Sequence, residues 1–255
     1  KIYALNLLQS LNYLDLFFFS KSKPVLKDLI EDYVDIHSHL LPGIDDGSKD
    51  IEMTFDLIQS LKNIGFSQFT ATPHIIKNIW DNDKSQIEAL LKTTSAALID
   101  KGIKNPFRAA AEYMMDESFS KLLKSEPLLV IKDNYILVEM SYINPPMQLH
   151  DILFEIRVAG YQPILAHPER CLFYHSNFDE YKKLKKAGCL FQLNLLSTVG
   201  YYGSSVANAA QKLLEKGMFD LTGSDVHHQN HIRSFDKKIT VKATEALKVA
   251  IKNNN

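Results

Sequence analysis

Short apolar runs alternate with amphipathic stretches along most of this chain. From Tyr33 onward, the runs are rich in β-branched and aromatic residues, and the stretches between them repeat apolar residues every three or four positions. This alternation is typical of βα units built around a parallel sheet. Seven strands are predicted, at residues 33–37, 68–72, 107–112, 135–140, 162–167, 190–194 and 219–224.

The clearest predicted helix lies between the first two strands. Ser48 can cap its start, Ile51, Phe55 and Ile58 form one apolar face, and Gly65 ends it. Further helices are predicted at residues 84–100, 148–159, 179–187, 205–216 and 240–252. A glycine lies near the end of five of these helices, as expected for a left-handed terminating residue: Gly65, Gly102, Gly160, Gly188 and Gly217.

The length of 255 residues suits either one large α/β barrel or two small domains. No long linker or repeat interrupts the pattern, so we expect one domain over residues 32–255 after an extension over residues 1–31. A net charge of −1 gives no electrostatic case for non-specific nucleic-acid binding, although local basic patches stay open. Two cysteines, Cys171 and Cys189, argue against a disulfide framework and favour a cytoplasmic location.

The N-terminal extension has an unusual apolar segment at residues 14–19. It is too short to span a bilayer, and Asn12 and Asp15 break the pattern of a secretory signal. One interpretation is a packing segment or a frayed extension. The other is a contact with a partner or with the inner face of the membrane, because Lys21, Lys23 and Lys27 lie beside the phenylalanines.

Candidate metal ligands recur where the predicted strands end. His37 and His39 are two residues apart on the first strand, so both imidazoles can face one ion, and the turn Asp45-Asp46-Gly47 follows. Strands of a parallel barrel present their carboxyl ends at one face, where such enzymes build their sites. The later candidates are His74, Glu112, Glu139, His167, Asp225 and His227.

Each candidate has an ordinary structural alternative when taken alone. His74 can be a loop histidine, Glu112 and Glu139 can pair with lysines, and Asp225 can cap the next helix. The joint pattern is harder to explain, because six of the seven predicted strands end in such residues. Buried carboxylates and imidazoles gathered at one face are costly unless they bind cations. Nitrogen and oxygen ligands without a thiolate suit Mn²⁺, Fe²⁺ or Zn²⁺.

These motifs resemble those of the PHP (polymerase and histidinol phosphatase) superfamily. The runs Asp35-Ile36-His37-Ser38-His39 and His167-Pro168-Glu169-Arg170 are most similar to the metal-dependent protein tyrosine phosphatases of bacterial capsule and exopolysaccharide loci. The similarity extends from Asp35 to His227. It implies an α/β fold, a distorted seven-stranded (β/α)7 TIM-like barrel, in agreement with the predicted strand count.

The resemblance also implies a trinuclear centre, with three divalent ions and manganese favoured over iron or zinc. His37, His39, Glu112 and Asp225 would hold the first ion, and Glu112 would bridge to the second. The remaining ligands implied by the resemblance are Glu139 and His167 for the second ion, and Asp46, His74 and His227 for the third.

Substrate contacts are predicted from four further residues. Arg170 would clamp a phosphate oxygen; the alternative is a surface ion pair with Glu169 or Glu180. Tyr201 or Tyr202 would stack on an aromatic substrate, with simple packing as the alternative. Arg233 is a candidate replacement for the arginine that follows Asp-x-His in the family. Asp45 is expected to belong only to the turn, and His228 and His231 are expected to face solvent.

The function implied is that of a phosphoric monoester hydrolase, a phosphotyrosine-protein phosphatase opposing a bacterial tyrosine kinase in polysaccharide export. A hydroxide activated by the metals would attack phosphorus, with Asp46 and Arg170 contributing to catalysis. One alternative is a small-molecule phosphatase of the histidinol-phosphatase type. Another is a non-catalytic module that docks a kinase through its N-terminus. A nuclease is disfavoured by the lack of basic charge.

Overall fold

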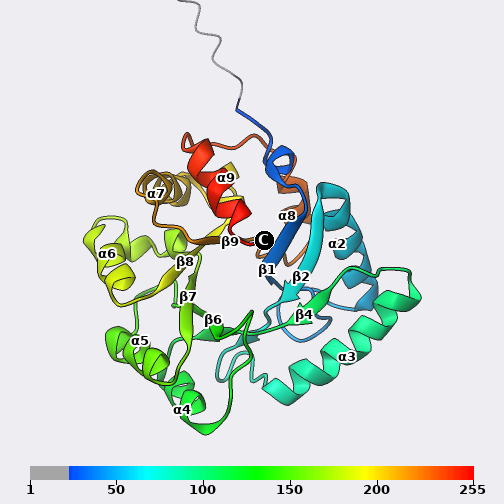
Figure 1. Cartoon of the computed structure of the whole chain (residues 1–255), viewed down its shortest axis with the longest axis horizontal. Helices are drawn as coiled ribbons and strands as arrows, with labels where there is room; N and C mark the ends of the chain where they lie inside the picture. Colours follow the sequence, from blue (N-terminus) through cyan, green and yellow to red (C-terminus); the bar gives the residue numbers. More distant parts are fainter. Residues whose placement is uncertain (1–22) are drawn as a thin grey trace, which may run out of the picture.

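The computed structural model describes residues 23–255 (Figure 1). The apolar segment at 14–19 and Lys21, on which the predicted membrane or partner contact depends, lie outside the described residues. Lys27 pairs with Asp236 at the surface, with 2.7 Å between Nζ and Oδ1. None of the described helices has the length and apolarity needed to cross a membrane.

Two parallel sheets carry the strands, which confirms the predicted βα organisation. The first sheet has the order β1-β2-β4 and the second the order β3-β5-β6-β7-β8-β9. In the first sheet the strands are β1 (Tyr33–Ser38), β2 (Phe66–Ala71) and β4 (Phe107–Ala109). In the second they are β3 (His74–Ile75), β5 (Glu112–Met114), β6 (Tyr135–Glu139), β7 (Gln162–Ala166), β8 (Leu190–Asn194) and β9 (Leu221–Gly223).

The predicted count of seven strands is wrong, because the described residues form nine. The short strand β3 follows the predicted strand at 68–72, and the predicted strand at 107–112 is divided between β4 and β5. Pro73 has no N–H for a ladder hydrogen bond, and it separates β2 from β3. Ala110 and Ala111 separate β4 from β5 at the corresponding point of the next pair of strands. Each break moves the chain from the first sheet to the second, and it places His74 opposite Glu112 in the β3–β5 pair.

The first and last strands lie side by side at their carboxyl ends. Ser38 forms a parallel bridge with Val226, and Asp225 donates its backbone N–H to the His37 carbonyl at 2.8 Å. The buried carboxylate of Asp35 accepts hydrogen bonds from the backbone N–H and the hydroxyl of Ser224. These contacts bring His37 and His39 next to the residues that follow β9.

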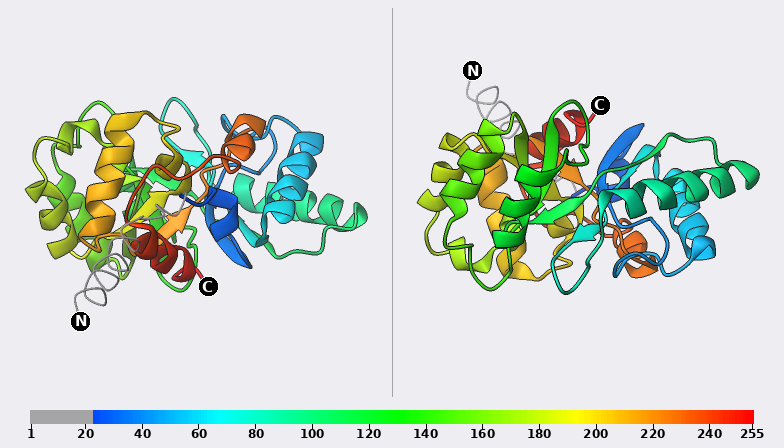
Figure 2. Two further views of the ribbon diagram at one scale, coloured as in Figure 1. Left: turned by 90° about the horizontal axis from the view of Figure 1, so that it is seen from above. Right: turned by 90° about the horizontal axis from the view of Figure 1, so that it is seen from below.

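The helices surround the sheets, as Figures 1 and 2 show. The predicted helices are confirmed within a few residues, while α4 and α8 were not predicted. Asp50, not Ser48, caps α2, because its carboxylate accepts the Met53 N–H at 2.8 Å. The helices are α2 (Ile51–Ile64), α3 (Lys84–Asp100), α4 (Glu117–Ser125), α5 (Leu149–Val158), α6 (Asp179–Lys186), α7 (Ser204–Glu215), α8 (Gln229–Ser234) and α9 (Thr244–Lys252).

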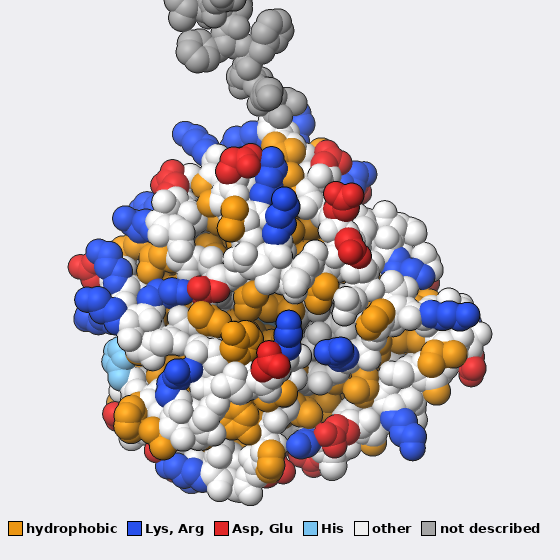
Figure 3. Space-filling view, viewed as in Figure 1, with side chains coloured by type: hydrophobic (Ala, Val, Ile, Leu, Met, Phe, Trp, Pro, Cys, Tyr) orange, Lys and Arg blue, Asp and Glu red, His pale blue; other side chains and the backbone are white. Residues whose placement is uncertain are grey.

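The hydrophobic core consists of two separate clusters of buried side chains. A small cluster that includes Ile36, Leu137 and Ile164 fills the space among the strands, and a large cluster packs the helices onto them. Hydrophobic side chains also gather near the centre of the face in Figure 3, while charged side chains surround them. Cys171 and Cys189 are free thiols, and both are buried.

Candidate metal centre

The carboxyl ends of the strands meet at a cavity of about 510 Å³. Seven of the nine predicted metal ligands line it, and the other two, His37 and His39, are fully buried against its carboxylates. The structure therefore brings all nine residues together from six separate stretches of the chain. Their ligand atoms form four overlapping groups: His39, Asp46, His74 and His227; His37, His167 and Asp225; His37, His39 and Glu112; His74, Glu112 and Glu139.

Glu112 lies at the centre of this constellation. Its Oε2 is 3.2 Å from His37 Nε2, 3.4 Å from His39 Nε2 and 3.3 Å from His74 Nδ1. Its Oε1 is 3.1 Å from His167 Nε2. One fully buried carboxylate thus faces four imidazoles.

Three of the imidazoles are oriented by hydrogen bonds on the ring nitrogen that faces away from the cavity. His37 Nδ1 is 2.8 Å from Gln192 Oε1, and His39 Nδ1 is 2.7 Å from Asp45 Oδ2. His227 Nδ1 is 2.9 Å from the carbonyl oxygen of Asp225. A proton on each Nδ1 leaves Nε2 with its lone pair directed at the cavity. Histidines that bind metals are held in this way.

Two of these supporting residues correct the sequence prediction. Asp45 was expected to serve only the turn, but its carboxylate binds His39 and also accepts the backbone N–H of Gly47 at 2.9 Å. The sixth predicted strand had no apparent site residue, yet Gln192 on β8 reaches His37. Gln192 and Asn194 are two residues apart and therefore lie on the same face of this strand. These two polar residues in an apolar run were the sequence feature that could have predicted a site residue here.

The buried charges of the site depend on one another. Burial alone would lower the pKa of His37, but the carboxylates of Glu112 and Asp225 raise that pKa to about 9. Burial likewise opposes ionisation of Glu112, and the surrounding imidazoles hold its pKa well below the usual range. Glu139 has its pKa raised by burial and by the charge of Glu112. The carboxylates therefore require positive charge beside them.

Buried polar atoms without hydrogen bonds indicate which positive groups would balance the carboxylates. His74 Nδ1 and Glu139 Oε1 lie 2.9 Å apart, and Glu112 Oε1 lies 3.1 Å from His167 Nε2, but none of these buried atoms makes a hydrogen bond of acceptable geometry. Leaving such atoms unpaired costs on the order of 1–3 kcal/mol each, and more when they are charged. Divalent cations would satisfy these atoms, and the mixed nitrogen and oxygen donor set fits Mn²⁺, Fe²⁺ or Zn²⁺.

Two predicted ligands have strained backbones. His167 and Asp225 have φ angles of 35° and 51°, in the left-handed region that few non-glycine residues occupy. His167 directly follows β7, and Asp225 comes two residues after the end of β9. Strain of this kind, on the order of 1–3 kcal/mol, persists at functional sites where the surroundings fix the residue.

Arg170 projects into the same cavity. Its Nη1 donates to Asp225 Oδ2 at 2.9 Å, and its guanidinium lies over the rings of Tyr142 and Tyr202, at 4.6 and 4.1 Å from their centroids. The alternative of a surface ion pair with Glu169 or Glu180 is wrong, and Glu180 pairs with Lys183 at 2.7 Å instead. Glu169 is fully buried and accepts hydrogen bonds from Asn194 N and Ser197 Oγ.

The aromatic partners of Arg170 were only half predicted. Tyr202 lines the cavity as expected, but Tyr142 was missed because it stands in the loop after β6, where no periodic pattern marks it. Tyr201 does not line the cavity; it packs edge-on against His231, with 4.8 Å between ring centroids. Tyr201 therefore has the packing role that was its alternative.

The structure does not bring Arg233 to the cavity. Its side chain is exposed on α8 and reaches Asn230, with 3.4 Å between Nη1 and Oδ1. The expectation that His231 faces solvent is also wrong, whereas His228 is partly exposed, and both residues line the cavity. His231 is buried, and its Nδ1 accepts the backbone N–H of His227 at 3.2 Å. It therefore supports the loop that carries Asp225 and His227.

Replacing Asp45 by asparagine is expected to weaken metal binding by about 10–100-fold, the usual effect of removing such a support. The amide no longer provides the anionic acceptor that orients His39. Isothermal titration with Mn²⁺ measures the change, and Asp236→Asn, which alters only an exposed ion pair, is the matched control. Equal affinity in Asp45→Asn and the parent chain would show that Asp45 does not support the site.

The fold and this constellation define an α/β protein with a candidate metal centre at the carboxyl edge of its parallel strands. The chain belongs to the family described as capsular polysaccharide synthesis, CpsB/CapC, whose pattern matches residues 33–248. This match confirms the family resemblance inferred from the motifs.

Individual relatives agree with the family assignment. The putative tyrosine-protein phosphatase CapC of Staphylococcus aureus is 26% identical over 195 residues, which cover 76% of each chain. The tyrosine-protein phosphatase YwqE of Bacillus subtilis (strain 168) is 25% identical over 196 residues, covering 76% of this chain and 77% of YwqE.

A solved structure has the same fold. It belongs to a study of YwqE from Bacillus subtilis and CpsB from Streptococcus pneumoniae, described as unique metal-dependent tyrosine phosphatases. The TM-score is 0.72 at 22% identity, over 87% of this chain and 95% of the other.

Proposed function

We propose that this chain is a metal-dependent phosphotyrosine-protein phosphatase. The observation that carries the proposal is the cluster of nine imidazoles and carboxylates, most of them buried, with Arg170 at its edge. Membership of the CpsB/CapC family and relatives named tyrosine-protein phosphatases support it. The chain would then be a phosphoric monoester hydrolase that opposes a bacterial tyrosine kinase in polysaccharide export.

The proposed centre holds three divalent ions, with manganese favoured and iron or zinc as alternatives. His37, His39, Glu112 and Asp225 would hold one ion, and Glu112 would also face a second. Glu139 and His167 would complete the second site, and Asp46, His74 and His227 the third. When bound, the metals would lower the pKa of the attacking water and neutralise charge on the phosphate oxygens.

Charge balance favours a phosphate monoester as the substrate of such a centre. Three divalent ions and four carboxylates, counted as ionised at neutral pH, leave a formal charge of about +2. A phosphate monoester dianion balances that charge, whereas a neutral substrate would not.

The chain's own residues would position the phosphate in the cavity. Arg170 is fixed between two aromatic rings, and its planar guanidinium has nitrogens that can bind phosphate oxygens in pairs. Asp46 lies at the cavity mouth with 56% of its side chain exposed, where it can orient an incoming group. Tyr202 forms a cavity wall that can contact an aryl ring.

Several larger-scale features belong to the same proposal. The two sheets would close as one distorted α/β barrel, a proposal supported by the Ser38–Val226 bridge. Residues 32–255 would form the phosphatase domain, and residues 1–31 an extension that contacts a kinase or the inner membrane face. The protein would act in the cytoplasm.

A substrate panel tests the proposal with the Mn²⁺-loaded protein. A phosphotyrosine peptide should be hydrolysed with a kcat/KM at least about 10²-fold above that of histidinol phosphate. A phenolate, with a pKa near ~10, leaves without a general acid, whereas an alkoxide needs one, and general acids contribute ~10²–10⁴-fold. Chelation should abolish both activities.

Two results would contradict the proposal in different ways. Equal rates with aryl and alkyl esters would identify a small-molecule phosphatase of the histidinol-phosphatase type. No turnover by the fully metal-loaded protein, together with tight binding of a tyrosine kinase, would identify a docking module instead.

A further inference from the structure

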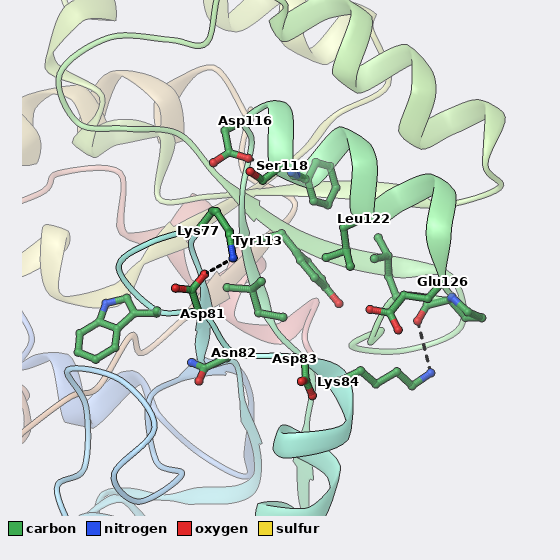
Figure 4. A pocket seen from close by; sticks show the side chains of 15 residues that line it. Lys77, Asp81, Asn82, Asp83, Lys84, Tyr113, Asp116, Ser118, Leu122 and Glu126 are labelled. Atoms are coloured by element: carbon green, nitrogen blue, oxygen red, sulfur yellow. Dashed lines mark hydrogen bonds and ion pairs between the residues drawn. The ribbon is translucent and has the colours of Figure 1, made fainter.

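A second cavity of about 250 Å³ adjoins the candidate metal centre, and we call it the side pocket (Figure 4). It lies between the segment that follows β3 and helix α4. Its apolar lining consists of Ile75, Tyr113, Phe119, Leu122 and Leu128, together with Trp80 and Pro127. In Figure 4, Tyr113 and Leu122 point into the space, while charged side chains stand around its edge.

The side pocket lies beside the metal-centre cavity. Trp80 lines both cavities, so its indole forms a shared wall. Ile75 follows His74 directly, and Asn82 of the side pocket donates to the His74 carbonyl at 2.9 Å. A chain segment whose phosphotyrosine occupies the metal-centre cavity would therefore pass the side pocket with a neighbouring residue.

The rim of the side pocket has a net negative charge. Two lysines and four carboxylates line the pocket, a formal balance of −2: Lys77, Lys84, Asp81, Asp83, Asp116 and Glu126. Lys77 is paired with Asp81 at 2.8 Å, which cancels one charge of each sign. Glu126 is exposed and forms no ion pair within residues 23–255. Asp83 and Asp116 cap α3 and α4, so Glu126 is the rim carboxylate, among the described residues, that is available to a cation.

We propose that the side pocket binds a bulky apolar side chain of the phosphorylated protein, close to its phosphotyrosine, with a lysine or arginine beside it at the acidic rim. The inference rests on the proposed phosphatase function. An apolar cavity of roughly 150 Å³ is large enough for benzene, so this one accommodates a leucine, methionine or phenylalanine side chain. The site would select among phosphotyrosine sequences.

Phosphotyrosine peptides with a single leucine, moved through each flanking position of an alanine background, test the apolar contact with the Mn²⁺-loaded protein. At one position leucine should raise kcat/KM by about 10-fold over alanine, the usual selectivity of an apolar pocket. Leu122→Trp, which fills the pocket, should reduce this leucine-to-alanine ratio to about one, and Leu122→Met should preserve it. Because the leucine-to-alanine ratio of kcat/KM is taken within each variant, a general loss of activity lowers both values equally and does not change the ratio.

A second panel tests the acidic rim. Placing lysine beside the preferred leucine should raise kcat/KM a few-fold at low salt, about the effect of one partly exposed charge pair. Glu126→Lys should reverse that preference. Glu215→Lys, an equal charge change on the exposed side of α7, should leave the preference intact.

The chain has a single tryptophan, Trp80, so its fluorescence gives a binding signal that does not depend on turnover. The dephosphorylated leucine peptide should change this fluorescence more than the alanine peptide does.

The two proposals fail separately. Hydrolysis of phosphotyrosine peptides without any positional preference would overturn the side-pocket proposal alone, as would a leucine preference that survives Leu122→Trp. If neither p-nitrophenyl phosphate nor any peptide is hydrolysed, the proposed function falls, and the side-pocket proposal falls with it.

Discussion

Replacing Glu112 by glutamine is expected to lower kcat/KM on an aryl phosphate by roughly 10³-fold or more, at the upper end for one active-site electrostatic contact. Glu112 is fully buried and lies within 3.4 Å of four imidazoles. A neutral amide cannot balance two cations, so the variant should also retain less metal. Elemental analysis of the purified variant measures that loss beside the kinetics.

A matched control separates this effect from a general loss of structure. Glu215→Gln makes the same chemical change at an exposed position and should keep both metal content and kcat/KM. Circular dichroism of Glu112→Gln should match that of the parent chain. Full activity and full metal content in Glu112→Gln would refute the metal mechanism.

Replacing Arg170 by methionine is expected to reduce kcat/KM by about 10²-fold, mainly through kcat, because the guanidinium should bind phosphate oxygens most strongly when their charge develops. Arg170→Lys should recover only part of this loss. Lysine keeps the charge, but it lacks the planar fork and stacks less well between Tyr142 and Tyr202. Steady-state kinetics with p-nitrophenyl phosphate measures both variants.

Arg233→Met is the control that the structure itself provides. Arg233 is exposed on α8 and does not line the cavity, so its loss should change kcat/KM less than twofold, as expected for a surface position. An equal loss in Arg233→Met and Arg170→Met would mean that both arginines reach the phosphate. It would contradict the placement described above.

The candidate ligands were predictable because strand ends are local features. An apolar run followed by His, Asp or Glu is visible in the sequence, and parallel strands must present those ends on the same edge. His37, Glu139 and Asp225 were found in this way, and the structure brings them together. The helices between the strands were predicted from the spacing of apolar residues, which is also a local feature of the sequence.

The passage of the chain from one sheet to the other was not predictable from the apolar pattern. Single strands were predicted at 68–72 and 107–112, yet the chain leaves the first sheet after β2 and after β4 and enters the second sheet at β3 and at β5. Sheet membership is decided by which neighbour accepts each backbone hydrogen bond, and those neighbours are distant in sequence. Only the assembled sheets set that choice.

The supporting residues depend on tertiary structure even more strongly. Gln192 orients His37 across 155 positions of sequence, and Tyr142 meets Arg170 only because two loops converge over the cavity. The sequence by itself determined which residue types lie at the strand ends, and therefore most of the candidate ligand set; Asp46 was added by the family resemblance. The tertiary structure alone decided which side chains orient those ligands and which arginine lies beside them. The reason is that hydrogen-bond partners and stacking contacts depend on strand register and loop packing, not on the local sequence pattern.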